Sequence, residues 1–165
     1  MKYSLILILS ATALTGCSYK VYVVRHAEKA AAPANDPPLS DAGMQRSADL
    51  KQTLQDKKIR AVYSTRTKRT MQTVAPLASY LNIQTTPYSA RPDSSLIAAI
   101  KSAKKNTVVV GHSNTVDDVV NLLAGKQLIP GDLSEAVYDN MFILTIKRGG
   151  GRATLGTQKY GRPTP

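Results

Sequence analysis

The sequence predicts an α/β fold, a three-layer α/β/α sandwich with a mainly parallel sheet. Short β-rich runs alternate with helical patterns along the chain, which is typical of a parallel sheet covered by helices. The run at residues 107–110 reads Thr-Val-Val-Val without interruption, as expected of a strand buried on both faces. The chain has 165 residues, of which 42% are hydrophobic, which suits a single domain with a real core.

Each element is predicted from local pattern and capping residues. Ser40 can cap the first helix, Gly125 can close the last, and Pro76 predicts a kink in the second. Strands or extended segments are expected at residues 20–25, 59–64, 83–88 and 107–110. Helices are expected at residues 41–56, 67–80, 95–103 and 113–123. A terminal hairpin is expected from residues 140–147 and 153–159, around the glycines at 149–151.

The N-terminus reads as a targeting segment. Lys2 is followed by an apolar stretch from residue 5 to residue 14, which is too short to cross a bilayer as a helix. The sequence Leu-Thr-Gly-Cys at 14–17 resembles the lipobox of bacterial lipoproteins. That resemblance implies a signal peptide at 1–16, a lipid such as palmitate on Cys17, and a mature domain at 17–165. An ordinary secretory signal with a chance cysteine is the alternative.

The resemblance also predicts a location. By the sorting rule of Gram-negative bacteria, Ser18 after the cysteine favours the outer membrane, with the domain in the cell envelope facing the periplasm. The formal net charge of +11 suits an anionic neighbour such as nucleic acid, an anionic membrane face or phosphorylated substrates, although a merely solvated surface is the alternative. With one cysteine and two histidines, neither an internal disulfide nor a structural zinc site is expected.

Both histidines of the chain follow predicted strands. His26 follows the strand at 20–25, and His112 follows the buried strand at 107–110. Ligands of open α/β sheets bind outside the carboxyl ends of the strands. We therefore expect the two side chains to meet at one edge of the sheet.

Two arginines are expected at the same edge. Arg25 is adjacent to His26, and Arg69 lies at the start of the second helix, where backbone N–H groups and a guanidinium together favour an anion. Arg66 and Lys68 are interpreted as a solvated basic face. The combination of two histidines, two arginines and helix starts predicts a phosphate pocket.

These residues carry a resemblance to the histidine phosphatase superfamily, also called phosphoglycerate mutase-like. Arg-His-Ala-Glu at 25–28 resembles its first histidine motif, and Gly-His-Ser-Asn at 111–114 its second. Residues 39–46 resemble the start of its first helix, and residues 64–73 the segment that bears its second arginine. The resemblance covers residues 20–160 and implies a phosphoglycerate mutase-like fold.

The departures from the family pattern favour a compact phosphatase over a mutase. Ala27 replaces a glycine, and Arg66-Thr67 replaces Pro-Leu. Mutases carry an asparagine six residues after the nucleophile, where this chain has Ala32, and they have a longer lid before the second histidine. A mutase, or a catalytically silent lipoprotein that binds phosphorylated ligands, remains the alternative.

The resemblance implies a phosphomonoester hydrolase that works through a phosphohistidine on His26, with no cofactor or metal. Arg25, Arg69, His112 and Asn114 would bind the phosphate. A carboxylic acid should protonate the leaving group, and Asp93 is the first candidate, with Asp117 and Glu28 as alternatives. The expected partners are a phosphorylated small molecule or phosphoprotein and the membrane, not nucleic acid.

Overall fold

The computed structural model describes residues 18–165, so the predicted signal peptide at 1–16 and the lipidation of Cys17 lie outside the described residues. It contains β1 (Ser18–Arg25), α1 (Asp41–Leu54), β2 (Ala61–Ser64), α2 (Lys68–Leu81), β3 (Thr85–Pro87), α3 (Ser94–Ala103), β4 (Thr107–Gly111), α4 (Val116–Ala124), β5 (Asn140–Lys147) and β6 (Thr154–Lys159). The predicted α/β class is confirmed.

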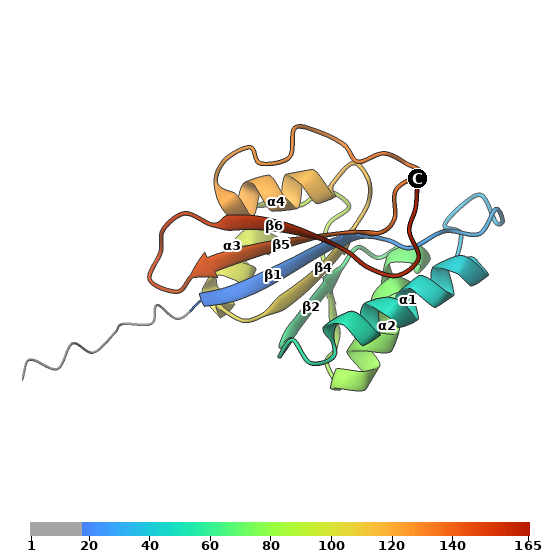
Figure 1. Ribbon diagram of the computed structural model, residues 1–165, viewed down its shortest axis with the longest axis horizontal. Coiled ribbons are helices and arrows are strands. Elements are labelled where there is room, and N and C mark those ends of the chain that lie inside the picture. Colours follow the sequence, from blue (N-terminus) through green and yellow to red (C-terminus); the bar gives the residue numbers. More distant parts are fainter. Residues whose placement is uncertain (1–17) are drawn as a thin grey trace, which may run out of the picture.

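The strands form one six-stranded sheet in the order β3-β2-β4-β1-β5-β6 (Figure 1). β3, β2, β4 and β1 are parallel, and β5 and β6 add an antiparallel hairpin at one side. The mainly parallel sheet and the terminal hairpin are therefore as predicted. β1 and β4 lie side by side at the centre, so the segments that follow them emerge together at one edge.

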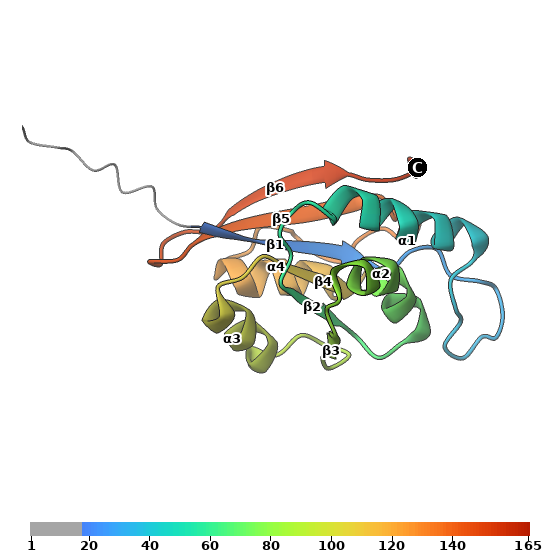
Figure 2. The same cartoon turned by 90° about the horizontal axis from the view of Figure 1, so that it is seen from below.

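Helices cover both faces of the sheet, α1 and α2 on one and α3 and α4 on the other (Figures 1 and 2). Successive side chains of a strand point to opposite faces. Val108 and Val110 of β4 accordingly join Leu50 and Leu77 in one apolar cluster, whereas Val109 joins a second cluster that includes Ile100. This burial on both faces explains the unbroken valine run.

Several element boundaries differ from the prediction, most of them for a local reason. α4 begins at Val116 and not at residue 113, because residues 113–115 form a turn in which Thr115 Oγ1 accepts a hydrogen bond from the backbone of His112 (3.0 Å). β2 and β3 are shorter than predicted, and α1 ends at Leu54. Pro76 lies inside α2 without ending it.

Residues 18–165 contain both apolar clusters, one on each face of the sheet. This part of the chain therefore encloses a hydrophobic core on each face and has the size of an ordinary independent domain. No helix within this part of the chain has the length and apolar character needed to cross a bilayer.

Candidate active site

The parallel pairing of β1 and β4 brings the two histidines together. Arg25 is paired with Gly111 in the register, and the next backbone N–H, that of His26, donates to the Gly111 carbonyl at 2.9 Å. The rings of His26 and His112 meet edge to face with centroids 5.4 Å apart. The structure thus places both predicted histidines at one sheet edge.

The hydrogen bonds of His26 determine which ring nitrogen is free. Its Nδ1 lies 2.7 Å from the carbonyl oxygen of Ala27. A carbonyl oxygen only accepts, so Nδ1 carries the proton in the neutral ring and Nε2 keeps its lone pair. The backbone N–H of Ala27 in turn donates to Thr73 Oγ1 of α2 at 2.9 Å, which fixes this segment. A neutral, oriented imidazole with a free Nε2 is the form needed for nucleophilic attack.

Burial keeps both histidines neutral. The His26 side chain is almost fully buried, and its pKa falls to about 3, first through desolvation and then through the positive charges of Arg25 and Arg69. Desolvation and the same two arginines lower the pKa of His112 to about 4. At neutral pH neither ring is positively charged.

His112 is held between a hydroxyl group and an arginine. Thr65 Oγ1 lies 2.9 Å from its Nε2, and Arg69 NH2 lies 3.4 Å from its Nδ1. Arginine only donates, so Nδ1 is the acceptor and Nε2–H donates to Thr65. Arg69 also lies 3.8 Å from a carboxylate oxygen of Asp36. The helix start of α2 therefore contributes Arg69 to the site as predicted.

Arg25 is buried beneath the loop that joins α4 to β5. Its NH1 donates to the carbonyl oxygens of Ser134 (3.0 Å) and Val137 (3.2 Å), and its NH2 forms an ion pair with Glu135. Its guanidinium also stacks on the Tyr138 ring at 4.2 Å. Within the described residues its buried Nε–H has no partner, and Arg25, predicted to bind phosphate, is not among the residues that line the cavity over His26.

A cavity of about 790 Å³ lies over these groups. Its lining includes His26, Lys29, Arg69, Arg91, His112, Ser113, Asn114 and Glu135. A second cavity of about 800 Å³ adjoins it at Thr67, Ala90 and His112. Asn114, predicted to bind phosphate, is thus in the same cavity as the two histidines.

Glu28, one of the candidate acids, has a structural partner. Burial alone would raise its pKa, but hydrogen bonds from Arg46, the shortest at 2.7 Å, outweigh burial and hold the pKa low. Arg46 also donates to the carbonyl of Tyr160 at 3.0 Å. Gly43 permits this approach of α1, because a Cβ there would lie 2.1 Å from the Glu28 carbonyl oxygen. Glu28 therefore ties the first motif to α1 and the C-terminal segment.

The structure does not bring Asp93 or Asp117 together with His26. Asp93 caps α3 by accepting from the backbone N–H groups of Ser95 and Leu96, and its side chain faces solvent. Hydrogen bonds, led by that from the Ser95 hydroxyl, lower its pKa, which does not favour a proton donor. Asp117 is buried and its pKa is raised by desolvation. In the described part of the chain, neither lines the cavity over His26.

Glu135 is the carboxylate that sequence reasoning missed. It lines the cavity with His26 and accepts hydrogen bonds from Arg25 and from the Ser113 hydroxyl. The Ser113 hydrogen bond, followed by the charge of Arg25, lowers its pKa. Glu135 lies in a loop without a recognisable motif, so only the return of that loop over β1 reveals its position.

The comparisons agree with this geometry. A family model of the histidine phosphatase superfamily (branch 1) matches residues 21–93. The structure of the protein histidine phosphatase SixA complexed with tungstate superposes with a TM-score of 0.66 at 20% identity, over 85% of this chain and 96% of that one. No curated protein sequence matches the chain.

Two further solved structures share the fold. Mycobacterial glucosyl-3-phosphoglycerate phosphatase has a TM-score of 0.64 at 11% identity, over 88% of this chain and all (100%) of that one. Phosphoserine phosphatase from Entamoeba histolytica has a TM-score of 0.57 at 13% identity, covering 88% and 98%. The family match over residues 21–93 and these structures agree that the chain has a fold similar to that of the histidine phosphatase superfamily.

The low pKa values lead to a direct prediction. The chain has only two histidines, so their ring protons are resolved in an NMR titration. Neither should titrate between pH 8 and about pH 5.5, because both rings stay neutral in the folded protein. In the unfolded chain they take up protons below about pH 6.5, so stability should fall as the pH drops from there toward 4. A midpoint near 6.5 for His26 would show that it is exposed and contradict the site.

Proposed function

We propose that this protein is a phosphomonoester hydrolase that works through a phosphohistidine on His26. The observation that carries the proposal is the neutral His26 ring, with its Nε2 lone pair free, in the cavity that Arg69 and His112 also line. Splitting hydrolysis into two displacements at one nitrogen replaces one difficult step by two easier ones. The phosphatases that share this fold support the assignment.

In the first step, Nε2 of His26 attacks phosphorus in line with the leaving oxygen. The N–P bond forms, the P–O bond breaks, and the leaving oxygen takes a proton. Arg69 stabilises the phosphoryl oxygens, Asn114 adds a neutral donor, and the buried guanidinium of Arg25 adds positive charge beneath the site. The phosphate dianion raises the pKa of His112, which then takes up a proton and adds a positive charge. These side chains supply the positive charge without a metal.

Glu135 supplies the proton transfer in place of Asp93. In the free protein Glu135 is ionised, because Ser113 and Arg25 stabilise the carboxylate. A phosphate dianion bound in the cavity beside Glu135 repels its carboxylate, which raises the pKa of Glu135 toward that of a proton donor. Glu135 gives its proton to the leaving oxygen. In the second step it accepts a proton from the water that attacks phosphorus, and the N–P bond electrons return to His26.

The adjoining cavity gives room for the leaving group. It starts at His112 and is lined by Tyr63, Tyr88, Leu96 and other residues of β2, β3 and α3. Its mixture of aromatic, apolar and basic groups accommodates an alcohol larger than the phosphate itself. A phosphorylated small molecule and a phosphorylated protein segment both fit this description.

Loss of the nucleophile is the first test. His26→Ala should lower the turnover of p-nitrophenyl phosphate by on the order of 10³-fold or more, because the covalent route is removed. An acid-labile, alkali-stable ³²P label should form on the wild type and not on the variant. Circular dichroism confirms that the variant is folded. A wild type that binds phosphate but never turns over substrate would favour a silent binding protein instead.

The acid is tested by varying the leaving group. Glu135→Gln keeps the size of the side chain and one of its two acceptor oxygens, and should slow turnover of an alkyl phosphate by about 10²–10⁴ more than that of a nitrophenyl phosphate. An alkoxide needs the proton, whereas nitrophenolate leaves nearly unaided.

The matched control for this test is Asp93→Asn, which keeps the α3 cap. It should affect both substrates equally and little. A selective effect of Asp93→Asn, with none from Glu135→Gln, would restore Asp93 as the acid.

We also propose that the protein is exported and anchored in the cell envelope through a lipid on Cys17, facing the periplasm from the outer membrane. The support is the lipobox-like sequence at 14–17 and the serine that follows the cysteine. β1 begins directly after Cys17, at Ser18, so such an anchor would hold the folded domain against the membrane.

Lipidation is tested in cells. The wild type should incorporate radiolabelled palmitate and sediment with the membranes, and Cys17→Ser should abolish the label because the thiol is its acceptor. The Cys17→Ser protein should appear unprocessed or in the soluble fraction. A wild type that is cleaved and soluble without label would indicate an ordinary secretory signal.

A further inference from the structure

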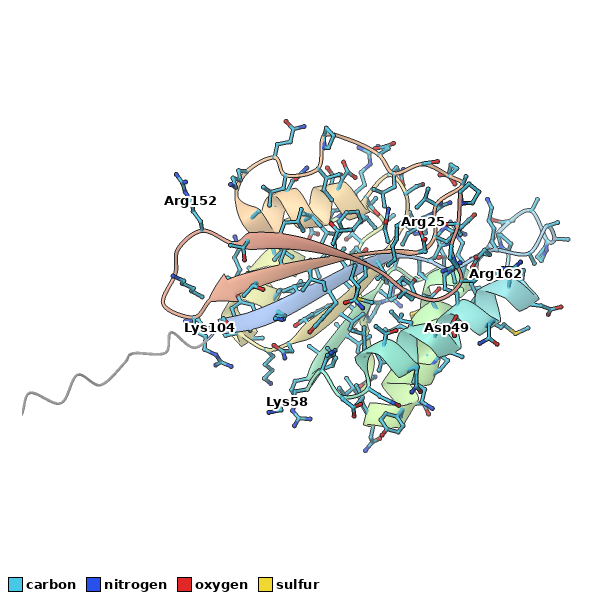
Figure 3. All side chains as sticks on the ribbon, in the orientation of Figure 1. Arg25, Asp49, Lys58, Lys104, Arg152 and Arg162 are labelled. Carbon is cyan, nitrogen blue, oxygen red and sulfur yellow. The ribbon has the colours of Figure 1, made fainter. Side chains whose placement is uncertain are left out.

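Basic residues gather at the end of the molecule away from the histidines. Three connecting segments meet at the edge where the parallel strands begin, at residues 55–60, 101–106 and 147–153. Together they contain nine lysines and arginines and a single acidic residue, Asp56. Figure 3 shows Lys58, Lys104 and Arg152 at this end, and Arg25 and Arg162 at the opposite end. The positive charge is therefore concentrated on one end face.

Four of these cations line one hollow of about 540 Å³. They are Lys101, Lys104, Lys147 and Arg148. All four side chains are exposed, and within residues 18–165 none of them forms an ion pair. The hollow has no acidic residue in its lining. Four unpaired cations around one hollow attract an anion strongly.

The floor of this hollow is apolar. Tyr19, Leu123 and Ile146 lie among the cations, and the glycines of the β5–β6 turn form one wall. Next to it, Leu122 of α4 is 47% exposed, and Lys101 Nζ contacts its carbonyl oxygen at 3.5 Å. Tyr19, Leu123 and Ile146 are buried beneath the cations, and the exposed Leu122 beside them supplies the apolar surface. Cations next to an exposed apolar side chain match a lipid surface, which offers anionic headgroups above hydrocarbon. A nucleic acid would offer phosphates without the apolar component.

The chain enters the domain at this hollow. Tyr19, in its lining, is the second residue of β1 and comes two positions after Cys17. The apolar stretch at residues 5–14 lies just upstream in the sequence. The basic end and the start of the folded domain thus coincide.

We propose that this end is a membrane-docking surface, and that the hollow lined by Lys101, Lys104, Lys147 and Arg148 binds the headgroup phosphate of an anionic phospholipid. β1 runs from this surface to His26 over 8 residues, which is about 25 Å at the usual strand rise. Docking therefore directs the catalytic cavity away from the bilayer. The surface acts independently of phosphate hydrolysis and of a lipid on Cys17.

The test uses the domain of residues 18–165, which carries both apolar clusters and lacks the predicted anchor. It should sediment with vesicles of phosphatidylglycerol and phosphatidylcholine, and not with phosphatidylcholine alone. Raising the salt from about 0.05 M to about 0.5 M should release it, because screening weakens the attraction. Failure to bind the anionic vesicles at low salt overturns the proposal.

Two double variants distinguish binding at the hollow from a general effect of the protein's net charge. Lys101→Gln/Arg148→Gln should weaken vesicle binding by roughly 30-fold, about fivefold for each charge near the surface. Lys68→Gln/Arg162→Gln removes the same charge from exposed residues near the other end and should change binding by less than about threefold. Equal loss in both pairs would mean that only net charge matters, against the proposal. Turnover of p-nitrophenyl phosphate by the Lys101→Gln/Arg148→Gln pair should equal that of the unsubstituted domain.

Two other ligands, glycerol phosphate and a short DNA duplex, test whether the proposed docking surface binds something other than a membrane. Glycerol phosphate at millimolar concentration should not displace the domain from vesicles, since a single soluble phosphate lacks the apolar surface. Displacement would indicate a site for a soluble ligand instead. A short DNA duplex should bind more weakly than the vesicles and be insensitive to the Lys101→Gln/Arg148→Gln pair. Tighter, variant-sensitive binding of the duplex would assign the surface to nucleic acid.

Discussion

The pairing of β1 with β4 is the constraint on which the site depends. These strands are neighbours at the centre of the sheet, run in the same direction, and are joined beyond their ends by the hydrogen bond from His26 N–H to the Gly111 carbonyl. A shift of the register by one residue would turn every side chain of β1 to the opposite face. The valines that fill both apolar clusters prevent that shift, and the core thereby determines where the two histidines meet.

Burial and positive charge act together on these histidines. Desolvation disfavours the charged imidazole, and Arg25 and Arg69 disfavour it further, so His26 keeps the lone pair that a nucleophile needs. The same arginines favour the arrival of an anion. In the free protein Glu135 partly balances them by pairing with Arg25.

A parallel sheet has two different ends, and in this domain the two ends carry different kinds of side chain. The carboxyl ends of β1, β2 and β4 lead into the segments that carry His26, Arg69 and His112. The opposite ends receive the chain at Ser18 and carry the lysine-rich connections. Because helices return the chain between the strands, the histidine-bearing segments and the lysine-rich segments are separated by the length of the sheet.

The sequence by itself determined the fold class, the central strands and four residues of the site. Uninterrupted valines predict a strand buried on both faces, and residues that follow such strands share one edge, so Arg25, His26, Arg69 and His112 could be placed from local pattern alone. The starts of α4 and β2 could not be predicted in this way, because a turn at Ser113 and pairing with neighbouring strands decide them.

Which carboxylate lies near His26 was decided only by tertiary structure. Asp93 has the right chain position but serves as a helix cap, whereas Glu135 comes from a long loop whose path depends on buried Arg25 binding its carbonyl groups. Local pattern records periodicity and capping, and it contains no information on where a loop returns across a sheet.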